Sequence, residues 1–135
     1  HKDSELDVFG SITGTRLGSD LFDKIEGYRD YRFTIVIENC QHDNYFTEKI
    51  TDAFATGTIP VYWGTSNIGD YFNTDGMIIF NTIEELKDIL DNLDEKFYDD
   101  RVDVVEENYE KSKEYWDFHA RVKHEITEFI GGENV

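Results

Sequence analysis

One stretch, residues 33–63, constrains the fold of this chain more than any other. Residues 33–37 are apolar on both sides except at Thr34, which is typical of a strand covered on both faces of a parallel sheet. The residues that follow are almost all polar. In open α/β sheets, ligands bind beside the carboxyl ends of the strands. The polar loop after Ile37 is therefore a candidate binding segment.

The residues after the polar loop predict a helix and a second strand. Apolar residues recur at helical spacing from about Thr47, and Gly57 is a typical helix stop. Residues 61–63 are apolar, and Pro60 is acceptable at the first position of a strand. The amino end of this helix lies beside the polar loop. It offers unpaired N–H groups and the positive end of the helix dipole, which suit a phosphate.

Four side chains near this helix start are candidate ligand contacts. Lys49 lies in the first turn, where a cation is unfavourable unless an anion is bound. Glu48 can accept from ribose hydroxyls, or can simply favour the helix start. Tyr45 can stack on a ring or donate to a phosphate, or can pack on the sheet edge. Asn39 either contacts a nucleotide at the strand end or forms a turn.

Three sequence pieces in this region resemble the donor-binding segment of the family 10 glycosyltransferases, the α-1,3/1,4-fucosyltransferases. That family carries Phe-Glu-Asn, a short variable loop, Tyr-[Val/Ile]-Thr-Glu-Lys and a Gly-Thr/Ile-Pro-Val segment. The matching pieces here are Glu38-Asn39, then, after five residues, Tyr45-Phe46-Thr47-Glu48-Lys49, and then Gly57-Thr58-Ile59-Pro60-Val61-Tyr62-Trp63-Gly64. The match covers roughly residues 31–80. One such string alone would be weak, and the order and spacing of all three make the resemblance specific.

The resemblance implies a fold and a donor. It implies an α/β fold with a Rossmann-like parallel sheet and flanking helices, like the C-terminal half of a GT-B glycosyltransferase, with a final helix that packs toward the other domain. It implies that GDP-fucose binds at Asn39, Tyr45, Thr47, Glu48 and Lys49, with Lys49 on the diphosphate and Glu48 on the ribose. Fucose would then pass to a glycan hydroxyl by single displacement with inversion.

The resemblance also implies that part of the catalytic machinery lies elsewhere. The family's general base is a glutamate in an N-terminal acceptor domain, and an upstream arginine completes its donor site. Neither has a match here, since Arg16 is in the wrong place. We therefore expect one donor-binding domain over residues 1–135, whose catalytic base is unknown from this chain. Glu38 either stabilises a developing oxocarbenium ion or, as the favoured alternative, accepts backbone N–H groups.

The remaining segments complete an alternating α/β pattern. Before the central unit, we expect a strand at 6–10, a loop at 11–19 and a short helix at 20–30. After it, we expect a loop with one helical turn at 65–72, a strand at 77–80 and a helix from Thr82 to about Leu93. Thr82 and Glu85 form a capping box there. Residues 100–130 predict one long helix, or two with a break near Ser112.

Composition disfavours several classes of function. The net charge of −17 disfavours nucleic acid and anionic membranes, but permits a single diphosphate at a local positive site. Cys40 is the single cysteine and cannot form an internal disulfide. Residues 99–103 resemble a metal-binding DxD only loosely and are interpreted as a helix cap. We therefore predict no metal and no cofactor besides the donor.

Adjacent His42 and Asp43 are disfavoured as a general-base pair, because neighbouring side chains usually point apart. The expected compartment is the cytoplasm for a bacterial or viral protein, or the Golgi for a fragment of a eukaryotic enzyme.

Two alternatives remain at the level of sequence. The domain could take another nucleotide sugar, because guanine and fucose contacts cannot be identified from these residues. It could instead be a non-catalytic acidic α/β module that binds a protein partner. Nucleotide binding by the domain distinguishes this second alternative from both transferase interpretations.

Overall fold

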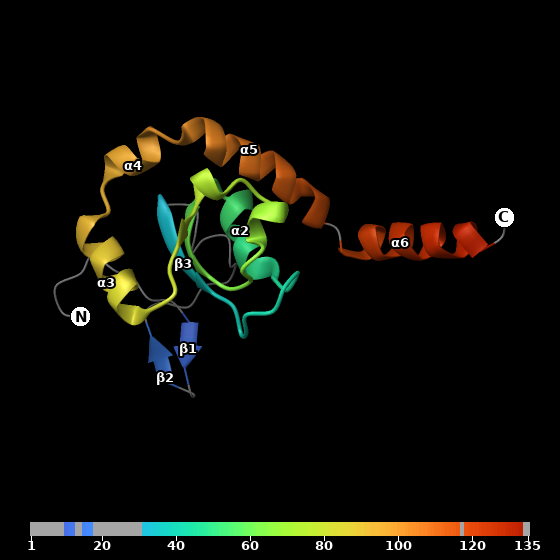
Figure 1. Ribbon diagram of the computed structural model, residues 1–135, viewed down its shortest axis with the longest axis horizontal. Coiled ribbons are helices and arrows are strands. Elements are labelled where there is room, and N and C mark those ends of the chain that lie inside the picture. The colour runs from blue at the N-terminus through green and yellow to red at the C-terminus, as the bar shows by residue number, and fades with distance from the viewer. Residues whose placement is uncertain (1–9, 13–14, 18–30, 117, 134–135) are drawn as a thin grey trace.

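A parallel sheet of three strands lies at the centre of the computed structural model (Figure 1), which describes residues 10–12, 15–17, 31–116 and 118–133. Its strands lie in the order β3 (Phe33–Ile37), β4 (Ile59–Trp63) and β5 (Ile78–Ile79). Ile37 lies opposite Trp63, and Tyr62 lies opposite Ile79. The parallel α/β arrangement predicted from the sequence is confirmed, although β5 is shorter than expected.

A second pair of strands lies where a loop was expected. Strand β1 (Gly10–Ile12) pairs antiparallel with β2 (Thr15–Leu17). The prediction of a loop over 11–19 is therefore wrong at these residues. Backbone hydrogen bonds hold antiparallel strands together. These two strands form although their sequences show no clear alternation of apolar and polar residues. The strand expected over 6–9 and the helix expected over 20–30 lie outside the described residues.

Helix α2 (Glu48–Ala55) connects β3 to β4 and covers one face of the sheet. Thr47 is its N-cap and accepts the N–H of Lys49 at 3.3 Å. The chain turns away from the helix at Gly57, whose φ of +69° favours glycine. The helix contributes to a buried core of Val36, Ile50, Ala53, Phe54, Tyr62, Ile68, Phe72 and Met77.

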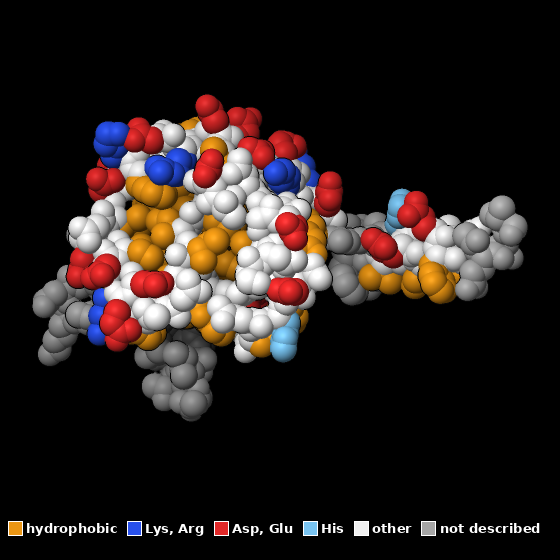
Figure 2. All heavy atoms as spheres, viewed as in Figure 1, with side chains coloured by type: hydrophobic (Ala, Val, Ile, Leu, Met, Phe, Trp, Pro, Cys, Tyr) orange, Lys and Arg blue, Asp and Glu red, His pale blue; other side chains and the backbone are white. Residues whose placement is uncertain are grey.

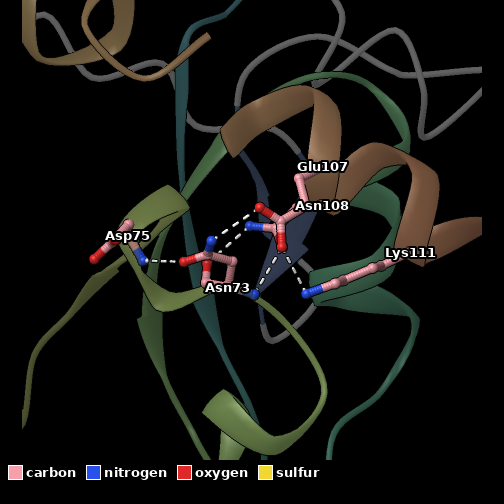
Figure 3. Close-up of polar contacts among 5 residues, drawn as sticks. All are labelled: Asn73, Asp75, Glu107, Asn108 and Lys111. Atoms are coloured by element: carbon pink, nitrogen blue, oxygen red, sulfur yellow. Dashed lines mark hydrogen bonds and ion pairs between the residues drawn. The ribbon is translucent and has the colours of Figure 1, made fainter. Parts of the chain in front are cut away.

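Helix α5 (Val102–Ser112) packs on α2 and holds the segment before β5 through a buried amide. Asn108 is fully buried, and its side chain accepts the N–H of Asn73 and donates to the carbonyl of Asn73, both at 2.9 Å. Figure 3 shows Asn73 also donating to Glu107, which pairs with Lys111. We call Asn73 and Asn108 the helix pair.

Two further helices lie between β5 and α5 in the chain. Helix α3 (Ile83–Asn92) starts as predicted, because Thr82 accepts the N–H of Glu85 at 3.1 Å. Helix α4 (Glu95–Asp99) was not predicted, and its cap is Asp94. The five residues of α4 are too few to show a helical period in the sequence.

The segment 99–103 does not cap a helix as predicted. Asp99 ends α4, and Arg101 stands at the N-cap of α5 without a side-chain cap bond. Asp100 pairs instead with Lys96 within the preceding turn. The prediction failed because α4 occupies the residues that were expected to precede a helix start.

The C-terminal helical region is divided. A short 3₁₀ turn, η3 (Lys113–Tyr115), follows Ser112, and α6 (Phe118–Glu133) extends away from the sheet (Figure 1). Figure 2 shows hydrophobic side chains along one edge of α6, where the exposed apolar residues are Val122, Ile126, Phe129 and Ile130. Packing of this helix toward another domain stays a prediction. Among the described helices, none combines the length and apolarity needed to span a membrane.

Candidate nucleotide-sugar site

A buried carboxylate closes the loop between β3 and α2. Glu38 follows β3 directly and is 2% exposed. Its two oxygens accept the N–H of Thr47 at 2.9 Å and the hydroxyl of Thr47 at 2.7 Å. Hydrogen bonds to an ionised carboxylate are shorter and stronger than neutral ones. Glu38 thus accepts a backbone N–H group at the start of α2, which is the favoured of the two roles predicted for it.

The helix start brings Lys49 and Asn39 together at the carboxyl end of β3. The ammonium group of Lys49 donates to Oδ1 of Asn39 at 3.2 Å. Lys49 therefore extends back over the amino end of α2, where N–H groups are unpaired within the helix. A positive charge and a helix dipole converge at this point, and both favour an anion.

Tyr45 lies between two anchored neighbours. Its N–H donates to the carbonyl of His42 at 3.0 Å, and the residue before it, Asn44, has a φ of +65°. Turns that need a positive φ at their third residue favour Gly or Asn there. On the other side, Phe46 belongs to an aromatic cluster with Tyr71, Phe72 and Tyr115. The centroid of its ring lies 4.9–5.7 Å from the ring centroids of these three residues.

A second asparagine pair joins this turn to the loop after β4. The N–H of Asn44 donates to Oδ1 of Asn67 at 2.8 Å, and Nδ2 of Asn67 donates to Oδ1 of Asn44 at 2.8 Å. The hydroxyl of Tyr71 donates to the same oxygen of Asn44 at 2.5 Å. We call Asn44 and Asn67 the loop pair. Beside it, the hydroxyl of Ser66 donates to Asp43 at 2.8 Å.

The core supports the loop pair through Tyr62 and Thr65. The hydroxyl of Thr65 donates to Oδ1 of Asn67 at 2.6 Å, and the N–H of Thr65 donates to the hydroxyl of Tyr62 at 3.3 Å. Burial raises the pKa of Tyr62 to about 12, the hydrogen bond from Thr65 opposes this shift, and the charge of Glu38 adds to it. Tyr62 is therefore neutral at physiological pH and can accept the N–H of Thr65.

A groove of about 860 Å³ runs between the amino end of α2 and α6. This volume is within the range of small-molecule sites, roughly 300–1,000 Å³. The groove is lined by Asn44, Phe46, Thr47, Glu48, Thr51, Tyr71, Tyr115, Val122, Glu125 and Ile126. Thr47 and Glu48 thus face the groove, whereas Asn39 and Lys49 meet at the strand end.

The structure thus places the predicted site residues in two neighbouring groups. Asn39 meets Lys49 at the strand end, and Thr47, which is bonded to Glu38, lines the groove with Glu48. Sequence reasoning missed the loop pair, because its two residues are separated by 23 positions. The identity of Asn44 is a weak signal for a turn with positive φ, but nothing in the sequence indicates Asn67 as its partner.

These features define a class of protein. The three-stranded parallel sheet with flanking helices is an α/β fold that this chain shares with solved GT-B fucosyltransferase structures. The chain belongs to glycosyltransferase family 10 (fucosyltransferase), whose C-terminal family model matches residues 1–129.

Several relatives agree with this assignment. The chain is 34% identical over 82 residues to the alpha-(1,3)-fucosyltransferase FucT of Helicobacter pylori, covering 61% of this chain and 17% of that protein. It is 36% identical over 59 residues to an alpha-(1,4)-fucosyltransferase of Arabidopsis thaliana, covering 42% of this chain and 15% of that protein.

A solved structure is also similar to this fold. The crystal structure of an alpha1,3-fucosyltransferase with GDP matches with a TM-score of 0.59 and 33% identity, covering 69% of this chain and 28% of that chain. The chain thus spans less than a third of the length of each of these relatives.

Proposed function

We propose that this chain is the donor-binding part of an inverting fucosyltransferase and that it holds GDP-fucose at the carboxyl end of β3. The observation that carries the proposal is the contact between Lys49 and Asn39 over the amino end of α2. An ammonium group and unpaired helix N–H groups at one point suit a diphosphate. The match to a GDP-bound fucosyltransferase structure supports the same donor.

The proposed chemistry is transfer of fucose to a glycan hydroxyl by single displacement, with α-1,3 or α-1,4 linkage. The acceptor hydroxyl attacks the anomeric carbon, the bond from that carbon to the diphosphate oxygen breaks, and GDP leaves. A base supplied by another domain takes the hydroxyl proton. Lys49 and the helix dipole offset the negative charge that grows on the leaving diphosphate, which lowers the barrier only if they act more strongly in the transition state.

The remaining donor residues have separate proposed roles. Glu48, the first residue of α2, accepts from the ribose hydroxyls. Tyr45 stacks on a ring or donates to a phosphate oxygen. Thr47 and Asn39 shape the turn around the diphosphate. No metal ion is required in this proposal, because Lys49 and the helix dipole supply the positive charge.

Calorimetric titration of GDP, and separately of UDP, tests the proposal. GDP should bind the chain, UDP should bind more weakly, and Lys49→Ala should weaken GDP binding about tenfold or more, or about 1.4 kcal/mol. The matched control is Lys87→Ala, which makes the same change of charge at an exposed position on α3. Lys87→Ala should leave the GDP affinity unchanged.

Three outcomes separate the alternatives. Equal affinity for GDP and UDP would keep a nucleotide-sugar site and remove the assignment to GDP-fucose. Equal losses of GDP affinity in Lys49→Ala and Lys87→Ala would show that GDP binding depends only on the net charge of the chain. Absence of binding by the unmodified chain would contradict a donor site that this chain forms by itself.

A further inference from the structure

The position of Tyr45 depends on residues outside its own loop. The backbone before it is held by the loop pair, and the backbone after it enters the aromatic cluster through Phe46. Asn44 adopts a left-handed conformation, which is unfavourable for most residues with a side chain. Asn tolerates this conformation better than most residues, and contacts from another segment add to the stability of the turn and to the direction in which Tyr45 leaves it.

Asn67 supplies two of these contacts, and the hydroxyl of Tyr71 supplies a third. Oδ1 of Asn67 accepts from the N–H of Asn44 at 2.8 Å and from the hydroxyl of Thr65 at 2.6 Å. Its Nδ2 donates to Oδ1 of Asn44 at 2.8 Å and to Asp70 at 3.1 Å. A side-chain amide has two acceptor sites and two donor hydrogens, so these four bonds use the full capacity of Asn67.

The support of Asn67 reaches the buried core. Thr65 is 3% exposed, and its N–H contacts the hydroxyl of the fully buried Tyr62. The buried Thr65 thus holds one side of Asn67, and the other side of Asn67 contacts Asn44. The series Tyr62, Thr65, Asn67 and Asn44 connects the rigid sheet to the loop that carries Tyr45.

We infer that Asn67 is a positioning residue for donor binding, an inference that rests on the proposed function. It holds the turn at Asn44 in one conformation, so that Tyr45 is already oriented when the nucleotide arrives. Without Asn67, the turn populates other conformations and only a fraction of molecules is ready to bind. The measured dissociation constant rises as the inverse of that fraction.

Calorimetric titration of GDP into Asn67→Ala tests this inference. We expect about tenfold weaker binding, which corresponds to about one molecule in ten with an oriented loop. The unfolding temperature should fall only modestly, because three of the four bonds lost are exposed and only the bond from the hydroxyl of Thr65 is partly buried. The matched control is Asn92→Ala, an exposed asparagine on α3 that donates to the carbonyl of Asp88. It should bind GDP as the unmodified chain does.

A double-mutant cycle distinguishes positioning from a general structural effect. Tyr45→Ala should weaken GDP binding, and adding Asn67→Ala should then cause little further loss, because there is no ring left to orient. Additive losses would overturn the inference, as would full affinity in Tyr45→Ala. Asn44→Gly keeps the left-handed turn accessible and removes the side-chain acceptor. It should weaken GDP binding in the same direction, and it serves as the test if Asn67→Ala fails to fold.

The outcomes also separate this inference from the proposed function. If Asn67→Ala binds GDP with full affinity while Lys49→Ala is weakened, the positioning role is wrong and the donor site stands. If the unmodified chain binds no GDP, both are overturned.

Discussion

Two asparagine pairs join distant segments of this molecule, and they differ in burial and in the groups they bind. In the helix pair, Asn108 is fully buried and contacts both the N–H and the carbonyl of Asn73. In the loop pair, Asn67 is half-buried and contacts the backbone N–H and the side chain of an exposed residue, Asn44. One pair fixes the packing of α5, and the other fixes a turn beside the candidate site.

The difference shows how the same amide chemistry can serve stability or orientation. A buried polar group that loses its partner bears the full cost of desolvation, whereas water replaces a partner lost at the surface. The helix pair should therefore contribute mainly to the free energy of unfolding. The loop pair should contribute little to that free energy and should act on the conformation of the loop that carries Tyr45.

The largest effect is expected from removal of the helix pair. Asn108→Ala leaves the N–H of Asn73 without its protein partner and removes one of the two donors to the carbonyl of Asn73, which still accepts the N–H of Gly76. With the loss of a fully buried side chain, the free energy of unfolding should fall by about 3 kcal/mol. Urea unfolding measures this change. GDP affinity under folded conditions should be unaffected, since the pair lies away from the strand end that carries Lys49. A loss below about 1 kcal/mol would show that the two pairs do not differ in this way.

An intermediate effect is expected from the backbone of Asn44. Asn44→Ala and Asn44→Gly remove the same side-chain bonds, but only alanine is strained at a φ of +65°. The alanine variant should be less stable than the glycine variant by about 1 kcal/mol. Thermal unfolding of the two variants side by side measures this difference. Equal stability would indicate that the turn relaxes to another conformation once the side chain is lost.

The smallest effect is expected from the charge beside the helix pair. Hydrogen bonds from Lys111 and then from Asn73 lower the pKa of Glu107 below its ordinary value of 4.5. A lowered pKa stabilises the folded state above about pH 4.5, and this stabilisation is lost as the pH falls through the folded pKa. Glu107→Gln should therefore unfold slightly more easily than the parent at pH 7, and this difference should shrink as the pH falls below about 4.5. A difference that does not shrink as the pH falls would contradict a role for the charge.

Much of the fold near the site follows from local sequence signals. The apolar run at 33–37 becomes β3, and the apolar stripe after Thr47 becomes α2 with Thr47 as its cap. Thr82 caps α3 in the same way. These elements are predictable because the spacing of apolar residues and the capping hydrogen bonds each involve only a few neighbouring residues.

Other features depend on contacts that no local pattern reveals. The hairpin β1–β2 is too short for a clear alternation, and α4 is too short for a helical period. Within the candidate site, the sequence indicates Lys49, Glu48 and Tyr45 but gives no sign of Asn67. Its role arises only because the fold places two polar loops side by side at the same edge of the sheet.

The most direct test of the account is a two-dimensional amide NMR titration of the chain with GDP. The largest shift changes should fall on residues 39–49, with further changes at Asn67 and little change in α3. Lys49→Ala should reduce these changes at the same GDP concentration. Shift changes confined to another surface, or none at saturating GDP, would contradict a donor site at the carboxyl end of β3.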